Sequence, residues 1–183
     1  VTHPDPGGLG RKPSIAAVVG SCDPNLSVYN TEVKLQPGDQ AVEEITDLRT
    51  MVKSLLFKFY DRTGYKPEKI IFYRDGVGIS QFAAIKAREV AAIRRACHVV
   101  GGEFYCPELV FIVVQKRNHC RLFHETPQRT VENPLPGTVV DTGITTAGQF
   151  DFFLCSHYGL LGTSRPTHYH VLVDDVRLNA DEV

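Results

Sequence analysis

The sequence contains no apolar run near the ~18–20 residues that a membrane-spanning helix needs. It also lacks an excess of one charge, because 20 Lys and Arg stand against 21 Asp and Glu, for a net charge of −1. This balance argues against a general polyanion-binding protein, so any nucleic-acid site has to be local. With 43% hydrophobic and 22% charged residues, the 183-residue chain has the composition of a single globular domain.

The sequence also lacks a C-x-x-C pair, and its five cysteines are an odd number. These two facts exclude a zinc ribbon and a complete disulfide framework. The first eight residues have the composition of neither a secretion signal nor a basic targeting helix. We therefore expect a reducing, cytoplasmic setting in which most of the cysteines are small buried hydrophobes. The cysteines are Cys22, Cys97, Cys106, Cys120 and Cys155.

The chain has no starting Met, and its last residues read as the start of a helix. Asn179 is a good N-cap, and Asp181 and Glu182 suit a first helical turn. A helix that starts just before Val183 indicates truncation, so we expect a partial domain over residues 1–183 that is cut at both ends.

The first ordered elements are predicted to form a β-hairpin. Ile15–Gly20 is continuously apolar, which is typical of a strand buried on both faces. Val28–Leu35 alternates apolar and polar residues, as a half-buried strand does. Residues 1–13 are expected to form a loop, because prolines and glycines recur in them.

Two helices are predicted next. Apolar residues recur every three or four positions from Val42, which indicates a helix that ends near Gly64, with an N-cap offered by Pro37-Gly38-Asp39. A second helix is expected to be capped by Ser80, to bury Phe82, Ile85, Ile93 and Cys97, and to expose Lys86, Arg88, Arg94 and Arg95.

The remaining strands are predicted at 69–73, 109–114, 138–141, 150–156 and 170–173, with a proline-rich surface loop at 125–137. Strands that alternate with two helices after an opening hairpin predict an α/β fold with a mixed sheet.

Carboxylates at two places are candidates for chemistry. Asp75 follows a predicted buried strand and precedes Gly76, where α/β sheets place ligands and metals. The alternative is a turn Asp that bonds its own backbone. Glu43 and Glu44 stand near the start of the first long helix, where they also suit the helix dipole without any further role.

Basic side chains gather in the stretch 115–124, at the end of an apolar strand. Such groups suit phosphate oxygens, although an ordinary solvated loop has the same composition. The stretch 159–166 is rich in glycine and hydroxyl groups and ends at Arg165, but it lacks the spacing and the lysine of a Walker A loop.

His168 and His170 place two imidazoles on one face of a strand. They are a candidate metal pair, yet no third ligand stands at a readable spacing. We therefore expect packed or hydrogen-bonded histidines.

Several of these segments belong to runs that occur in a characteristic order along the chain. The runs are Val1–Pro4, Lys12–Ser21, Ile70–Val77, Phe111–Arg117, Phe150–Phe152, Leu154–His157, Gly162–Pro166 and His168–Asp175. Together they resemble the PIWI domain of Argonaute proteins, in the Argonaute rather than the Piwi branch. The resemblance implies an RNase H-like mixed sheet with flanking helices, in a larger protein that uses a small guide RNA to find complementary RNA.

In family members that cleave RNA, three acidic residues and a histidine hold two Mg²⁺ ions. The resemblance assigns Asp75 to a catalytic, metal-binding position and Glu43 to the mobile acidic position, with Glu44 as the alternative one residue along. The first Asp of the family would directly precede Val1, and the His would lie beyond Val183. We therefore predict that this chain alone does not cleave RNA.

The resemblance also assigns positions to binding partners. It places a group of side chains on the backbone of the guide RNA: Lys116, Arg117, Arg121, His157 and Arg165. It places another group where Argonautes of animals receive Trp side chains of silencing proteins: Phe59, Tyr60, Tyr65, Lys66 and Tyr105. The alternative for the rings is core packing, and the segment Val99–Cys106 departs from the family in length and in Gly101-Gly102.

Two functions follow from the resemblance. The first is an endoribonuclease that, in the full-length protein, cleaves guide-paired RNA in gene silencing. The second is a non-cleaving guide-binding module that silences by recruiting Trp-rich proteins. An unrelated RNase H-like nuclease is disfavoured by the density of matching runs.

Overall fold

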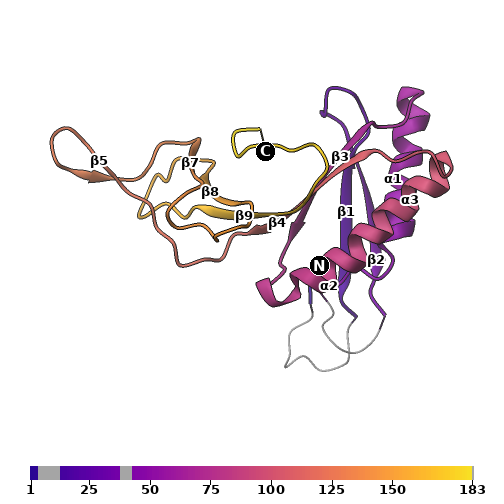
Figure 1. Cartoon of the computed structure of the whole chain (residues 1–183), viewed down its shortest axis with the longest axis horizontal. Helices are drawn as coiled ribbons and strands as arrows, with labels where there is room; N and C mark the ends of the chain where they lie inside the picture. Colours follow the sequence, from indigo (N-terminus) through magenta and orange to yellow (C-terminus); the bar gives the residue numbers. More distant parts are fainter. Residues whose placement is uncertain (4–12, 38–42, 183) are drawn as a thin grey trace. The chain divides into compact units, whose positions relative to one another are not determined.

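A computed structural model describes residues 1–3, 13–37 and 43–182 of the chain. They form two compact units (Figure 1). Unit 1 comprises Val1–Ile70 and Gly78–Glu108, and unit 2 comprises Ile71–Val77 and Leu109–Val183. The loop expected before residue 13 and the N-cap expected at Asp39 lie largely outside the described residues.

The predicted hairpin opens unit 1. β1 (Ile15–Ser21) pairs antiparallel with β2 (Tyr29–Leu35). The expectation that β1 is buried on both faces is wrong, because Ala16 and Val18 are buried whereas Ile15 and Val19 are 41% and 58% exposed. Successive residues of a strand point to opposite faces, and in the described structure only one face of this hairpin is covered.

The face of β2 that carries polar residues is tied to a helix. Glu32 accepts hydrogen bonds from Ser54 Oγ at 2.7 Å and from Lys58 Nζ at 2.5 Å. These bonds lower the pKa of Glu32, the Lys58 bond most of all. The apolar side chains Tyr29, Val33 and Leu35 lie on the opposite face and are exposed.

That helix is α1 (Leu48–Thr63), which lies against the hairpin. It ends as predicted, because Gly64 adopts φ +80° and donates its N–H to Tyr60 O at 2.8 Å. It begins later than predicted, with Asp47 at the N-cap position. Ile45 therefore precedes the helix, although it is buried as its place in the apolar pattern suggested.

The second helical region consists of four consecutive pieces. They are a 3₁₀ turn η1 (Ile79–Gln81), α2 (Phe82–Ile85), a π-helical turn η2 (Lys86–Val90) and α3 (Ala91–Gly101). The predicted cap at Ser80 is wrong, because Gly78 precedes the first turn and donates its N–H to Gln81 Oε1 at 3.0 Å. The predicted inner face is confirmed at Ile85, Ile93 and Cys97, which are buried, whereas Phe82 is only half-buried. Helix α3 packs against α1 (Figure 1).

Unit 2 contains most of a five-stranded sheet. Its strands are, in spatial order, β3 (Lys69–Asp75), β4 (Glu108–Gln115), β9 (Thr167–Asp174), β8 (Asp151–Cys155) and β7 (Thr138–Val140). The pairs β4–β9, β9–β8 and β8–β7 are antiparallel. The apolar centre of β4 is fully buried, as predicted, whereas Ile71 and Tyr73 of β3 are 41% and 51% exposed, so β3 is not the buried strand that was expected.

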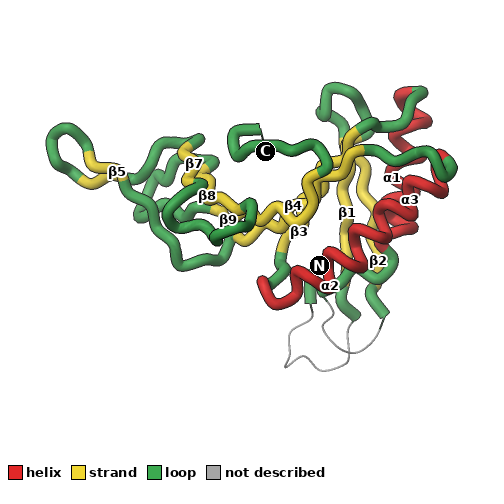
Figure 2. Tube along the Cα trace, viewed as in Figure 1, coloured by secondary structure: helices red, strands yellow, loops and turns green. Residues whose placement is uncertain are grey.

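The segments that connect the strands from β4 to β9 are mostly loops (Figure 2). Within the region predicted as loop, β5 (His124–Glu125) pairs with β6 (Val131–Glu132) in a small antiparallel ladder. At the expected helix start, residues 180–182 form a turn and not a helix. Asp181 N–H donates to Asn179 Oδ1 at 3.0 Å, and Asn179 N–H donates to Glu182 Oε2 at 2.9 Å, so Asn179 makes the side-chain bond expected of an N-cap.

None of the helices in the described ranges is long and apolar enough to cross a membrane. All five cysteines are described and free; Cys22, Cys97 and Cys155 are buried, as predicted for most of the five, whereas Cys106 is exposed and Cys120 is half-buried.

Burial should make the cysteines differ strongly in reactivity. Burial raises the pKa of Cys97 to about 11, so only about one Cys97 in a thousand is a thiolate at pH 8. We expect a thiol reagent at pH 8 to label Cys106 rapidly and Cys97 at least about tenfold more slowly, measured by peptide mass spectrometry. All five should label in urea. Equal rates for the two residues in the folded protein would contradict the packing of α3.

Candidate metal and nucleic-acid site

Glu43 lies in unit 1 in the segment that leads into α1. Its Oε1 accepts a hydrogen bond from His3 Nε2 at 2.7 Å, and His3 Nδ1 lies 2.8 Å from Ser14 Oγ. Both the Glu43 and His3 side chains are about one-quarter exposed. Because α1 begins only at Leu48, Glu43 and Glu44 are not acids of a first helical turn, and that alternative is excluded.

The backbone next to Glu43 is fixed by the side chains of Gln36 and Glu89. Gln36 Nε2 donates to Glu44 O at 2.5 Å, and Gln36 Oε1 accepts from Thr46 N at 3.2 Å. The buried carboxylate of Glu89 accepts the N–H of Ile45 at 2.9 Å. Glu44 pairs with Arg88, so the carboxylate of Glu44 is already engaged by a cation.

Asp75 is the last residue of β3, in unit 2, and its side chain is 59% exposed. Its Oδ2 lies 2.8 Å from Lys116 Nζ, directly after the neighbouring strand β4. The turn that follows Asp75 is held by Gln115, whose Nε2 donates to Val77 O at 2.9 Å. The structure thus brings together a predicted metal ligand and a predicted phosphate contact.

The basic stretch after β4 is anchored by Asn118. Its Nδ2 donates to Pro166 O at 2.8 Å, and its Oδ1 accepts from Cys120 N at 3.1 Å. Arg121 folds back onto its own loop and donates to Asn118 O at 3.1 Å. Lys116, which pairs with Asp75, and Arg117 are both exposed. The bond to Pro166 joins this stretch to the loop that carries Arg165.

The loop from Gly159 to Pro166 is anchored by Asn133. Asn133 Oδ1 accepts the N–H of Ser164 at 2.9 Å, and its Nδ2 donates to Gly162 O at 2.8 Å. Arg165 is exposed, whereas the buried Ser164 Oγ finds no hydrogen-bond partner among the described residues. His157, also exposed, precedes the loop. A buried hydroxyl without a partner is costly, and an oxygen of a ligand would satisfy it.

The aromatic candidates lie together at the end of α1, in unit 1. Phe59 and Tyr65 meet edge to face with ring centres 5.9 Å apart, and Lys66 Nζ lies 5.3 Å from the centre of the Tyr105 ring. Tyr105 donates its hydroxyl to Pro67 O at 2.7 Å, and burial raises the pKa of Tyr105.

This aromatic cluster also explains the Gly101-Gly102 pair. A Cβ at Gly101 would lie 2.4 Å from the Cβ of Tyr105, so only glycine permits this close approach. Tyr60 and Tyr65 are 44% and 51% exposed. The assignment of these rings to a partner site stays a prediction.

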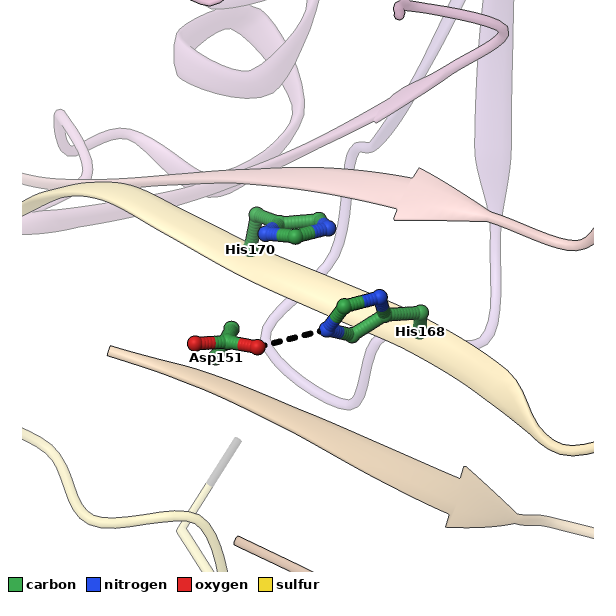
Figure 3. A group of neighbouring side chains, drawn as sticks. All are labelled: Asp151, His168 and His170. Atoms are coloured by element: carbon green, nitrogen blue, oxygen red, sulfur yellow. Dashed lines mark hydrogen bonds and ion pairs between the residues drawn. The ribbon is translucent and has the colours of Figure 1, made fainter. Parts of the chain in front are cut away.

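The two histidines of β9 are hydrogen-bonded, as expected. His168 Nε2 lies 2.6 Å from Asp151 Oδ2 (Figure 3). His170 Nε2 lies 3.3 Å from Gln115 Oε1. Burial, with a smaller contribution from neighbouring His168, lowers the pKa of His170 to about 4. His170 is therefore neutral at pH 7.

Known proteins share this arrangement of strands and helices. The family model described as "Piwi domain" matches residues 1–183. This chain belongs to the Piwi domain family. Its α/β fold with a mixed sheet is therefore the RNase H-like fold of that family, as the sequence predicted.

Three solved structures define the relationship further. The C-terminal lobe of a budding yeast Argonaute is 32% identical, with a TM-score of 0.83 over 94% of this chain and 37% of that one. Kluyveromyces polysporus Argonaute with a guide RNA is 32% identical, with a TM-score of 0.82 over 95% of this chain and 22% of that one. Drosophila Piwi is 26% identical, with a TM-score of 0.73 over 94% of this chain and 22% of that one. The chain thus spans less than two-fifths of each of these proteins.

The sequence missed the residues that hold the Piwi-domain candidates in place. Glu89, Gln115, Asn118 and Asn133 each bond backbone or side chains far along the chain. Asp151 was missed as a partner of His168, although a lone carboxylate at the start of the apolar strand Asp151–Cys155 was a usable signal.

Glu89 should be the main support of the segment next to Glu43. In a protein that contains this chain, Glu89→Ala leaves the Ile45 N–H without its acceptor, at a cost of about 1–3 kcal/mol. We expect hydrogen exchange in residues 43–48 to accelerate about 5- to 150-fold by mass spectrometry. Glu89→Gln keeps an acceptor oxygen and should change exchange much less, and the exposed Glu103→Ala serves as the control. Equal effects of Glu89→Ala and Glu103→Ala would refute this role.

Proposed function

We propose that this Piwi domain, within a longer protein, holds the backbone of a small guide RNA and takes part in cleaving the paired target RNA. The observation that carries the proposal is the contact between Asp75 and Lys116 at the ends of β3 and β4. One strand end supplies a carboxylate suited to a metal ion, and the next supplies a cation suited to a phosphate.

The guide-binding part rests on the basic loops of unit 2. Lys116, Arg117, His157 and Arg165 are all exposed, and the loops that carry Lys116 and Arg165 are joined by the Asn118–Pro166 bond. Such side chains contact phosphates without reading sequence, as a guide of variable sequence requires. Arg121 donates to its own backbone in the described structure, so we assign it the support of the loop as well as a phosphate contact. A similar protein, K. polysporus Argonaute, has been solved with a guide RNA.

The cleavage part rests on Asp75 and Glu43. Carboxylate oxygens are the ligands that Mg²⁺ prefers, and the Asp75 side chain is exposed enough to take one, so these residues fit Mg²⁺. When bound, Mg²⁺ would activate water and stabilise the leaving oxygen. In the free chain, Lys116 balances the charge of Asp75, and His3 holds Glu43. We propose that Asp75 exchanges Lys116 for the metal, whereas the catalytic role of Glu43 rests on the family resemblance alone.

A second candidate function is a non-cleaving module that recruits Trp-rich proteins. The observation in its favour is the group of half-exposed rings with Lys66 at the end of α1. Exposed aromatic rings beside a cation suit an incoming indole. This function needs no metal at Asp75, so the cleavage experiment below separates the two.

The guide-binding proposal predicts a salt signature. In a protein that contains this chain, Arg165→Ala and Lys116→Ala should each weaken binding of a single-stranded guide RNA. Each should also make the negative slope of log binding constant against log salt concentration shallower by about 0.7. Arg95→Ala on α3 makes the same change of charge at an exposed site outside the basic loops and should leave the slope unchanged. If Arg95→Ala and Arg165→Ala reduce the magnitude of this slope equally, these loops are not the guide site.

The cleavage proposal predicts that Asp75 acts on chemistry and not on guide binding. Asp75→Asn should reduce Mg²⁺-dependent cleavage of guide-paired RNA by about 10²-fold or more, with guide affinity unchanged within about threefold. The exposed Asp141→Asn is the matched control. Guide binding without cleavage in the unsubstituted protein would favour the non-cleaving module, and loss of guide binding in Asp75→Asn would assign Asp75 to RNA contact.

A further inference from the structure

Unit 2 contains a second group of potential metal ligands, separate from Asp75. Strands β8 and β9 bring Asp151 together with His168 and His170, which lie 17 and 19 positions after it in sequence (Figure 3). The antiparallel register sets Asp151 opposite His170. One ligand atom from each residue lies within 4.8 Å of the others.

These ligand atoms are in the protein interior. The Asp151 side chain has no exposed surface, the His168 side chain is 12% exposed, and His170 is 3% exposed. The ring of Phe153 stacks on that of His168 at 3.9 Å between centres and 16° between planes. A buried carboxylate is costly unless a positive charge or several donors stabilise it, so a cation at this place would lower the free energy of the folded state.

The neighbours of the three residues resemble the outer shell of a metal site. Asp151 Oδ1 accepts the N–H of Thr146 at 2.9 Å, which orients the carboxylate. Gln115 Oε1 faces His170 Nε2, and the Gln115 amide is itself oriented by its bond to Val77 O. Histidines that bind metals are commonly held in this way by an amide, carbonyl or carboxylate on the other ring nitrogen.

We propose that Asp151, His168 and His170 bind one divalent transition-metal ion of the Zn²⁺ type. Two imidazole nitrogens and one carboxylate oxygen suit Zn²⁺, whereas Mg²⁺ prefers a shell of oxygen atoms. The site is therefore chemically distinct from the carboxylate site proposed at Asp75. Because the ligands are buried, the ion has a structural role: it cross-links β8 to β9.

Binding requires a small local movement. The 2.6 Å between Asp151 Oδ2 and His168 Nε2 suits a shared proton. Two ligands of a tetrahedral Zn²⁺ with bonds of about 2.0–2.1 Å stand about 3.3 Å apart. The ion takes the place of the hydrogen between the two atoms, and the two side chains separate by about 0.7 Å. From an imidazolium the displaced proton passes to solvent, and from a neutral imidazole it moves to Nδ1 of His168, so the ligand is a neutral imidazole in either case.

The site is connected to the proposed functional residues through Gln115. This side chain contacts His170 on one side and the turn after Asp75 on the other. An ion that holds His170 would therefore also reduce movement of Gln115 and of the turn. Binding of an ion here requires neither guide binding nor cleavage, so the metal-site proposal is tested independently of the proposed function.

Co²⁺, which reports its coordination through visible absorption, is the probe for the first experiment. A protein that contains this chain is stripped with a chelator and titrated with Co²⁺ in a Cys106→Ser background. That background removes the exposed thiol 3.4 Å from His98, a second place where Co²⁺ would bind. We expect one equivalent of four- or five-coordinate Co²⁺, displaced by Zn²⁺ but not by Mg²⁺. Zn²⁺ at 100-fold above its Kd should raise the melting temperature by about 5–10 °C.

Substitutions then assign the ligands. His170→Gln and Asp151→Asn keep hydrogen-bonding groups of similar size, and each should weaken Co²⁺ binding at least about tenfold. His124→Gln removes an exposed imidazole elsewhere in unit 2 and should have no effect. Absence of bound Co²⁺ in the parent protein, or equal binding by His170→Gln and His124→Gln, would overturn the proposal.

X-ray absorption of the Zn²⁺-loaded parent protein provides a test that does not depend on variants folding. We expect a shell of nitrogen and oxygen atoms with the multiple scattering of two imidazoles. A shell containing sulfur, or one without imidazole, would also overturn the proposal.

Discussion

The side-chain amide of Gln115 is the contact on which the candidate sites of unit 2 depend. It donates to Val77 O, in the turn after Asp75, and its oxygen faces His170 in the sheet. The Asp75–Lys116 pair is largely exposed, and exposed ion pairs contribute little to stability. The position of the Asp75 turn is therefore set mainly by a half-buried amide, and the ion pair remains free to exchange partners.

The elements of this Piwi domain were predictable where one local signal was sufficient. Gly64 ends α1 because the position after the helix has a left-handed backbone conformation, which glycine adopts most easily. The apolar centre of β4 is buried, as its composition suggested. The hairpin was predicted, but its burial was not. In β2 the polar residues face α1, because Glu32 bonds Ser54 and Lys58, and no periodicity reveals a pairing across 22 and 26 positions.

The residues of the candidate site likewise divide into those that a local sequence signal could predict and those that depend on contacts distant in sequence. Asp75 and Lys116 could be found because each follows a predicted strand, and neighbouring strands bring their ends together. The contact between Asp151 and His168 could not be predicted from the sequence, since a shift of one residue in the β8–β9 register would place the two side chains on opposite faces of the sheet. Glu89 was missed because a buried carboxylate within a helix gains its role only from the Ile45 N–H, 44 positions away.

The contact between Gly101 and Tyr105 has a consequence beyond this molecule. Since any Cβ at position 101 would collide with the tyrosine, the residues at the two positions cannot change independently. A related protein with a side chain at the first position has to place glycine at the second, because the collision is with the Cβ of residue 105, or turn its backbone differently. The two positions should therefore covary, and the shape of the aromatic surface at the end of α1 should differ between lineages accordingly.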